Sequence, residues 1–294
     1  MSFKSEKTMA LSGLDYSNYS TEEIKKLFAE LLAEGMHGIC FSAYLEGQKP
    51  GDVLTEEQVR QRMLILQPYT KWIRSFSCIE GNEWIPKIAK ELGIKTLVGA
   101  WLGNDKDKNE EEIEQLIALA KEGLVNIAAV GNEVLYRNDL TAEELLGYIH
   151  RVKAALPDIP VGYVDAYYEF RDHPEISQAC DVILANCYPY WEGCHMDYSL
   201  VYMKQMFQQA VQAGGGKKVI ISETGWPSQG SNCKAAEPGE LNAMKYFINA
   251  QQWSAAEDIE IFYFTSFDES WKVGSEGDVG AYWGLWDQNG ELKF

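Results

Sequence analysis

The sequence predicts an α/β fold: a single closed barrel of eight parallel strands with outer helices, the (β/α)8 or TIM barrel. Three observations support this fold class. The length of 294 residues suits one such barrel. Short apolar runs alternate along the chain with segments of helical period, which is typical of a parallel barrel. No change in composition divides the chain, so we expect residues 1–294 to form one domain.

An extension, residues 1–37, precedes the first strand and carries one helix. Ser20-Thr21-Glu22-Glu23 is a predicted capping box, and apolar residues follow at helical spacing as far as Gly35. No outer helix is evident after the eighth strand, where residues 267–294 are expected to form a long loop. We therefore expect the leading helix, residues 21–34, to cover the flank of the barrel that an eighth outer helix would cover.

Runs rich in apolar and β-branched residues predict the strands, because a strand buried on both faces needs apolar side chains on both. They lie at residues 38–43, 71–76, 94–100, 125–130, 161–165, 181–186, 219–221 and 259–265. Helical spacing and capping residues predict the outer helices between these runs. In chain order, six outer helices are expected: one beginning at residue 55, one at 82–92, one that includes 113–120, one beginning at residue 142, one that includes 200–211, and one at 239–254.

The chain is strongly acidic, with 26 Lys and Arg against 44 Asp and Glu and a net charge of −18. This charge repels polyanions, so we expect no binding to nucleic acid or to anionic membranes. No apolar run is long enough for membrane insertion. A neutral substrate is expected instead. The 9 Trp and 16 Tyr offer flat faces that suit sugar rings, although aromatic side chains also fill barrel cores.

Cysteine and histidine give no sign of a metal centre. The 6 cysteines form no CxxC pair and the 4 histidines are scattered, so we expect buried free thiols, no metal and no cofactor. We also expect a monomer. Residues 1–12 lack the apolar core of a signal peptide. The expected location is therefore cytoplasmic, or secreted, periplasmic or cell-surface if a leader was removed, and a polymeric substrate favours export.

Two predicted strands lead into a glutamate. The run Val219-Ile220-Ile221 leads to Glu223, and Gly225 and Pro227 beyond it cannot extend the strand. The fourth strand is followed by Gly131-Asn132-Glu133. The carboxyl ends of barrel strands share one rim, where such folds carry their chemistry. Two carboxyl groups there can act as nucleophile and acid on a glycosidic bond, although either glutamate alone could simply cap a turn.

Distinctive motifs surround both glutamates. They are Val130-Gly131-Asn132-Glu133 and Ser222-Glu223-Thr224-Gly225-Trp226-Pro227-Ser228. Further segments follow in order: Gly47-Gln48-Lys49-Pro50, Ile73-Arg74-Ser75-Phe76, Tyr188-Pro189-Tyr190-Trp191-Glu192-Gly193, Phe267-Asp268-Glu269-Ser270-Trp271-Lys272 and Trp283-Gly284-Leu285. Together, from about residue 38 to the C-terminus, these motifs resemble glycoside hydrolase family 17, the β-1,3-glucanases and β-1,3-glucanosyltransferases on a (β/α)8 barrel. The resemblance is closer to the bacterial and fungal branches than to the plant enzymes.

This resemblance implies a role for each residue that matches the family. Glu133 would be the general acid and base, and Glu223 would be the nucleophile. Asn132 would hydrogen-bond the 2-hydroxyl of the sugar at the point of cleavage. Arg74 and Tyr188 would stand beside the nucleophile, where a cation and a phenol favour the ionised carboxylate.

Other site residues are expected further along the rim. Glu269, Lys272 and Glu276, hereafter the charged group, match residues that support the acid in the family, although Lys272 could also be an ordinary surface lysine. We expect Trp226 to be a stacking platform for a sugar ring, and Tyr44 to contribute to substrate binding.

Four more side chains lie near predicted strand ends. Trp101 and Trp191 fit either a platform or simple packing at the rim. Asp165 and Glu169 are expected to be solvated, or to lie behind the residues that touch substrate.

The predicted activity is retaining hydrolysis of β-1,3-glucosidic bonds in laminarin-type glucan or its oligosaccharides, through a covalent glycosyl-enzyme. The same pair of carboxyl groups would serve a β-1,3-glucanosyltransferase, so transglycosylation is the alternative. A non-catalytic glucan-binding barrel is the third hypothesis, which the presence of both glutamates disfavours.

Overall fold

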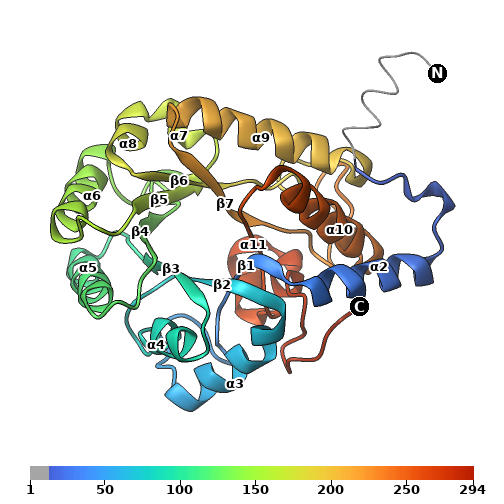
Figure 1. The fold of residues 1–294 in the computed structure, drawn as a ribbon, viewed down its shortest axis with the longest axis horizontal. Coiled ribbons are helices and arrows are strands. Elements are labelled where there is room, and N and C mark those ends of the chain that lie inside the picture. The colour runs from blue at the N-terminus through green and yellow to red at the C-terminus, as the bar shows by residue number, and fades with distance from the viewer. Residues whose placement is uncertain (1–12) are drawn as a thin grey trace.

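The computed structural model describes residues 13–294, which form a closed barrel of eight parallel strands (Figure 1). Each strand pairs with the next, and β8 pairs with β1 to close the barrel. The strands are β1 (Met36–Cys40), β2 (Thr70–Ser75), β3 (Lys95–Ala100), β4 (Ile127–Asn132), β5 (Val161–Ala166), β6 (Val182–Asn186), β7 (Lys218–Thr224) and β8 (Ile261–Tyr263). This topology confirms the predicted fold class.

Long helices surround the barrel (Figure 1). They are α2 (Thr21–Glu34), α3 (Glu56–Leu66), α4 (Trp84–Glu91), α5 (Lys106–Lys121), α6 (Ala142–Ala155), α9 (Ser199–Gly214) and α10 (Glu240–Glu257). Capping boxes at Ser20 and Thr141 begin α2 and α6, since each hydroxyl accepts a backbone N–H that the first turn leaves unpaired. The sequence pattern did not predict α7 (Glu169–Asp172) or α8 (Pro174–Ala179), because four or six residues are too short to display a helical period.

Helix α2 takes the position expected for a substitute eighth helix. It runs alongside α10, the helix that follows β7 (Figure 1). The buried ring of Phe28 contacts Phe247 of α10, with 4.8 Å between centroids, and Phe294 at 5.2 Å. The ring of Phe247 in turn lies 5.2 Å from Tyr263 of β8. The prediction that residues 1–12 lack a signal-peptide core lies outside the described residues.

The segment after β8 is not the helix-free loop that the sequence predicted. It contains the 3-10 turns η4 (Ser270–Lys272) and η5 (Asp278–Tyr282), with the short helix α11 (Val273–Glu276) between them. These elements have three to five residues each, again too few for a periodic pattern. They matter because they bring the charged group back over the barrel mouth.

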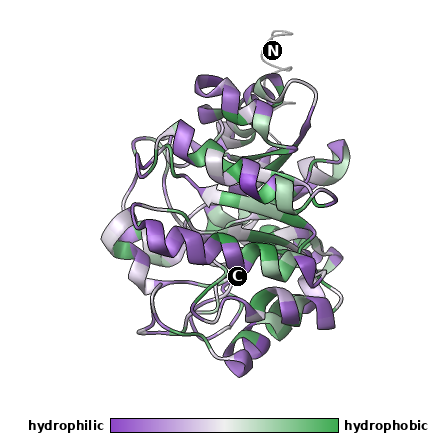
Figure 2. Cartoon of the chain, turned by 90° about the vertical axis from the view of Figure 1, so that its left-hand side faces the viewer, coloured by the Kyte–Doolittle hydropathy of each residue, from purple (hydrophilic) through white to green (hydrophobic). Residues whose placement is uncertain are grey.

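The core follows the predicted apolar runs. Buried side chains come from every strand: Ile39, Ile73, Leu97, Val130, Val164, Leu184, Ile220 and Phe262. Hydrophobic residues concentrate on the central strands, whereas the surrounding helices carry both hydrophobic and hydrophilic residues (Figure 2). Within residues 13–294, no helix has the length and apolar character needed to cross a membrane.

All six cysteines are free thiols, and all but Cys233 are buried. In the part of the chain that the structure describes, no three His, Cys, Asp or Glu side chains are grouped so as to hold a metal ion.

Candidate active site

Backbone irregularities at the ends of β4 and β7 present the two glutamates. The pairing of β4 with β5 shifts register between Ala129 and Asn132. Gly131 and Glu133 there adopt left-handed φ angles of 86° and 51°. A side chain on Gly131 would also collide with Val134, because a Cβ at Gly131 would stand 2.8 Å from the Val134 Cγ2. The pairing of β7 with β8 likewise shifts between Ile221 and Thr224. Such bulges turn a side chain away from the regular alternation of a strand.

Glu223 is held by two donors. Its Oε1 lies 2.7 Å from Nη1 of Arg74, and its Oε2 accepts a hydrogen bond of 2.7 Å from the phenol of Tyr188. Arg74 and Glu223 are 1% and 5% exposed, so water does not weaken this ion pair greatly. An arrangement in which both oxygens accept from fixed donors suits a carboxylate that must attack as an anion.

Arg74 connects the two strand ends. Its Nη2 donates to Oδ1 of Asn132 at 2.6 Å, while its Nη1 holds Glu223. The contact fixes which way the amide of Asn132 faces. Among the described residues no acceptor binds its Nδ2, so this N–H group is free to donate to a substrate hydroxyl.

Glu133 has a different environment from Glu223. Its Oε1 accepts a hydrogen bond of 2.8 Å from Asn186, whose own Oδ1 accepts from Ser222 at 2.8 Å. Burial raises the pKa of Glu133 from 4.5 to about 7, and the negative charge of Glu223 contributes to the rise, whereas the Asn186 hydrogen bond opposes it. Glu133 therefore keeps its proton close to neutral pH, as a general acid must.

The charged group lies close to Glu223. Lys272 is 6% exposed, and its Nζ lies 2.6 Å from Glu269 and 4.1 Å from the centre of the Phe264 ring. Burial opposes the charge on Lys272, but Glu269 and Glu276 outweigh it and raise the pKa of the lysine. Burial raises the pKa of Glu276 to about 7, and Lys272 opposes this shift while Glu223 adds to it. Lys272 is therefore not a surface lysine.

Residues 38–284 of the chain match the BtgE/BtgC glycoside hydrolase domain family. The chain belongs to glycoside hydrolase family 17. It is 27% identical to a glucan 1,3-β-glucosidase of Saccharomyces cerevisiae, across 100% of this chain and 98% of the yeast protein. A glucan 1,3-β-glucosidase of Arthroderma benhamiae is 30% identical, across 70% of this chain and 72% of that protein.

Solved structures show the same architecture. The family 17 β-1,3-glucanosyltransferase of Rhizomucor miehei superposes with a TM-score of 0.80 at 28% identity, covering 89% of this chain and 96% of that one. An endo-laminarinase from Formosa has a TM-score of 0.78 at 19% identity, covering 90% of this chain and 87% of that chain, which is a likeness of fold alone.

The predicted role of Trp226 is wrong for this glycoside hydrolase. Trp226 is 1% exposed, and its indole N–H donates to the carbonyl of Glu237 at 2.8 Å. The rings of Tyr190 and Tyr246 lie 5.2 Å and 5.4 Å away and cover the indole. No face is left for a sugar ring, so Trp226 supports the loop after β7 instead of binding substrate.

Two other tryptophans at the rim of the glycoside hydrolase are open to solvent. Trp101 follows β3 and Trp191 lies in the loop after β6, and each is 41% exposed. The guanidinium of Arg137 lies 4.6 Å from the Trp101 ring, and Trp191 packs on Trp283 at 5.5 Å. In both, one side of the ring is packed and part of the ring is open to solvent.

The remaining predicted residues are Tyr44, Asp165 and Glu169. Tyr44 is 9% exposed and meets Trp271, beside the charged group, edge to face at 6.3 Å. Asp165 is fully buried, which excludes the solvated alternative and agrees with the other expectation, that it lies behind the residues that touch substrate. Glu169 is partly buried and lies 3.5 Å from His173 in an ion-pair geometry.

Sequence reasoning missed Asn186, which binds the acid, and Ser222, which orients that amide. A signal was present for Asn186, because it is a polar residue at the end of an otherwise apolar strand. Ser222 belongs to the motif around Glu223, but the sequence does not show its partner, because that partner lies on the neighbouring strand β6.

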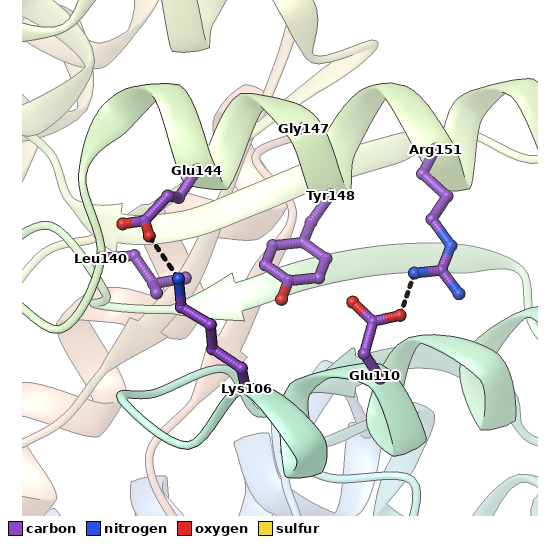
Figure 3. A pocket seen from close by; sticks show the side chains of 7 residues that line it. All are labelled: Lys106, Glu110, Leu140, Glu144, Gly147, Tyr148 and Arg151. Carbon is purple, nitrogen blue, oxygen red and sulfur yellow. Dashed lines mark hydrogen bonds and ion pairs between the residues drawn. The ribbon is translucent and has the colours of Figure 1, made fainter.

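A hollow on the outside of this glycoside hydrolase lies away from both catalytic candidates. It has a volume of about 300 Å³ and lies between α5 and α6, where Lys106 pairs with Glu144 at 3.1 Å and Arg151 pairs with Glu110 (Figure 3). Tyr148 fills the space between these pairs (Figure 3). The ion pairs join two outer helices, and neither catalytic candidate contributes to the lining.

Proposed function

We propose that the protein is a retaining hydrolase of β-1,3-glucan that works through a covalent glycosyl-enzyme on Glu223. The observation that carries this proposal is that the two glutamates have different environments. Arg74 and Tyr188 hold Glu223, whereas burial and the charge of Glu223 give Glu133 a pKa of about 7. One group is thus prepared to attack and the other to donate a proton, which is the division of labour of a retaining glycosidase.

In the first step Glu223 attacks the anomeric carbon while Glu133 passes its proton to the departing glycosidic oxygen. The bond to the leaving sugar breaks, and an ester forms between the glucosyl unit and Glu223. Because the ester carries no charge, the contribution of Glu223 to the raised pKa of Glu133 disappears. Glu133 is then a carboxylate able to take a proton from water, which attacks the same carbon and restores the original stereochemistry.

The side chains around the pair would stabilise the charge that develops on the sugar. The free N–H of Asn132 is available to the 2-hydroxyl, an interaction that strengthens as the anomeric carbon becomes positive. The charged group would support the acid, as the resemblance implies, from a position in which Lys272 and Glu276 also interact with the charge of Glu223, and Tyr44 would line the same wall. Each of these roles is part of the proposal.

Glucan linked β-1,3 is the proposed substrate because the similar proteins are named as enzymes that act on it. The yeast relative is a glucan 1,3-β-glucosidase and matches this chain from end to end. A neutral polymer also agrees with the net charge of −18. We propose further that the whole chain is a single catalytic domain and that it acts as a monomer.

Transglycosylation is the second candidate. The Rhizomucor miehei structure, at 28% identity over 96% of its chain, is a β-1,3-glucanosyltransferase. The same glycosyl-enzyme yields either outcome, depending on whether water or a sugar hydroxyl reaches it first. Incubation with a single laminari-oligosaccharide separates the two, because only transfer gives products longer than the substrate.

Substitution of each glutamate tests the catalytic assignment. Glu133→Gln is expected to lower kcat/KM on laminari-oligosaccharides by about 10²–10⁴-fold, the usual contribution of a general acid. It should lower kcat/KM far less on a dinitrophenyl glycoside, whose leaving group needs no proton. Glu223→Gln should abolish turnover of both substrates.

Azide provides a stereochemical control. With Glu133→Ala, azide should intercept the glycosyl-enzyme and give the β-glycosyl azide. With Glu223→Ala, azide should replace the nucleophile and give the α-glycosyl azide. Full activity of Glu223→Gln, or the same azide anomer from both variants, contradicts the proposed function.

A further inference from the structure

We propose that Asp165 is a positioning residue for Glu133: with Tyr163 it holds the chain that follows the acid, and it places a negative charge near it. This inference rests on the proposed function, since it assigns Asp165 a task in proton donation. No sequence pattern assigns Asp165 such a task, and the family resemblance does not include it.

The argument starts from hydrogen bonds between β5 and the turn after β4. Tyr163 and Asp165 are two residues apart on β5, so their side chains leave the strand on the same side. Both are fully buried. The phenol of Tyr163 donates to Oδ2 of Asp165 and accepts the backbone N–H of Leu135 at 2.9 Å. Oδ2 of Asp165 also accepts the backbone N–H of Tyr136 at 3.3 Å.

The side-chain contacts continue a backbone tether. The N–H of Glu133 donates to the carbonyl of Val164 at 2.7 Å. Three successive residues of β5 therefore hold three nearby amides, at Glu133, Leu135 and Tyr136. The other oxygen of Asp165 accepts the N–H of Ala166 at 2.7 Å, which fixes the orientation of its carboxylate.

Glu133 needs such a tether because of its backbone. Its φ of 51° lies in the left-handed region, which non-glycine residues adopt only when the surrounding structure enforces it. If the turn relaxed toward an ordinary conformation, the carboxyl would leave its hydrogen bond to Asn186. The buried pair on β5 opposes that relaxation.

Charge is the second way in which Asp165 acts. Groups from every neighbouring element influence Glu133: besides burial, Glu223 on β7 and Asp165 on β5 raise its pKa, while Asn186 on β6 and Arg137 after β4 lower it. Burial raises the pKa of Asp165 itself to about 6, against its hydrogen bonds from Tyr163, Ala166 and Tyr136, and Glu169 of α7 adds to the rise. His173 pairs with Glu169 rather than with Asp165. Above pH 6 Asp165 is thus ionised, and its negative charge helps Glu133 to stay protonated in the same pH range.

The test is the pH profile of Asp165→Asn. Removal of the charge should move the alkaline limb of kcat/KM on laminari-oligosaccharides to lower pH by about half a unit. Relative to the wild type, activity at pH 8 would then fall about threefold more than activity at pH 5.5. A ¹³C NMR titration of the Glu133 carboxyl should report the same shift without turnover.

Tyr163→Phe separates the tether from the charge. It removes the acceptor for Leu135 but keeps the carboxylate, so kcat/KM on oligosaccharides should fall at every pH. With a dinitrophenyl glycoside, where no acid is needed, both variants should approach the wild-type kcat/KM. An equal loss on both substrates, or an unmoved alkaline limb and NMR titration in Asp165→Asn, overturns the proposal.

Glu112→Gln is the matched control. Glu112 is 3% exposed, and burial raises its pKa to about 7, but it binds Ser77 and the N–H of Cys78 in the loop after β2. Because Glu112 does not contact Glu133 or the turn after β4, its replacement should leave the alkaline limb in place. Failure of the proposed function can be distinguished from failure of the Asp165 proposal. In the former case, Glu133→Gln would keep wild-type activity on oligosaccharides.

Discussion

Glu133 is expected to make the folded protein less stable at the pH at which it serves catalysis. Its pKa rises from 4.5 to about 7 on folding, chiefly through burial. Between these two values the native state binds more protons than the unfolded chain, so stability falls as pH rises through this window. Glu133→Gln removes that loss. Its amide keeps a carbonyl that can accept the hydrogen bond from Asn186.

The size of the effect follows from the two pKa values. One unit of difference corresponds to about 1.4 kcal/mol. Above pH 7 the full difference applies, and Glu133→Gln should stabilise the protein by about 3 kcal/mol relative to wild type. At pH 5 only about 1 kcal/mol of this remains, because that pH lies only about half a unit above the ordinary pKa of a glutamate. The gain in unfolding free energy between pH 5 and pH 8 is therefore about 2.5 kcal/mol, or about 4 °C in Tm for this length.

Urea unfolding of both proteins at pH 5 and pH 8 measures this difference directly. Effects of the substitution that do not depend on pH, such as a changed hydrogen bond, cancel between the two conditions. Glu34→Gln, an exposed glutamate at the end of α2, is the control for the substitution itself. If the stability difference between Glu133→Gln and wild type is the same at both pH values, Glu133 is not held neutral by the fold, and its role as acid loses its physical basis.

Three further substitutions test the surroundings of the nucleophile. Arg74→Met leaves buried Glu223 without its cation, so urea unfolding should show a loss of about 3–5 kcal/mol; an unchanged midpoint would mean that the ion pair is unimportant. Tyr188→Phe removes one hydrogen bond to a charged group and should lower kcat about 10–100-fold with little change in KM, unless the phenol is dispensable. Trp226→Phe should cost about 1–3 kcal/mol of stability without changing KM, and a raised KM in a stable variant would restore a role in binding.

The sequence predicted the barrel well because its strands are uniformly apolar. A parallel strand covered on both faces leaves little choice of residue, so an apolar run and a following breaker identify it. Strand ends were harder to predict. Asn132 and Thr224 still pair with neighbouring strands although they are polar, and β7 therefore extends past the apolar run that ended at Ile221. The catalytic candidates lie within or beside the irregular pairing, where polarity no longer indicates the end of a strand.

What the sequence could not supply was the contact partner of each side chain. Trp226 stands three residues after Glu223, and proximity along the chain suggested proximity in the site. In the fold it faces Tyr190 and Tyr246 instead. The backbone at Gly225, between Glu223 and Trp226, runs so close to Phe264 that a Cβ there would lie 2.0 Å from its carbonyl oxygen. The burial of Asp165 likewise depends on a turn from another strand, which no local pattern encodes.

Burial raises the pKa of several acids near the barrel mouth, and the negative charge of neighbouring acids adds to the rise. Arg74 and Lys272 are each engaged by one carboxylate, Glu223 and Glu269. The further acids Glu133, Glu276 and Asp165 share the same buried surroundings, and each has a raised pKa. Such an excess of acids disfavours an anionic sugar and favours a neutral one that becomes positive as its glycosidic bond breaks. The negative charge of Glu223, which adds to the effect of burial on the pKa of Glu133, thus also stabilises the oxocarbenium character of the transition state.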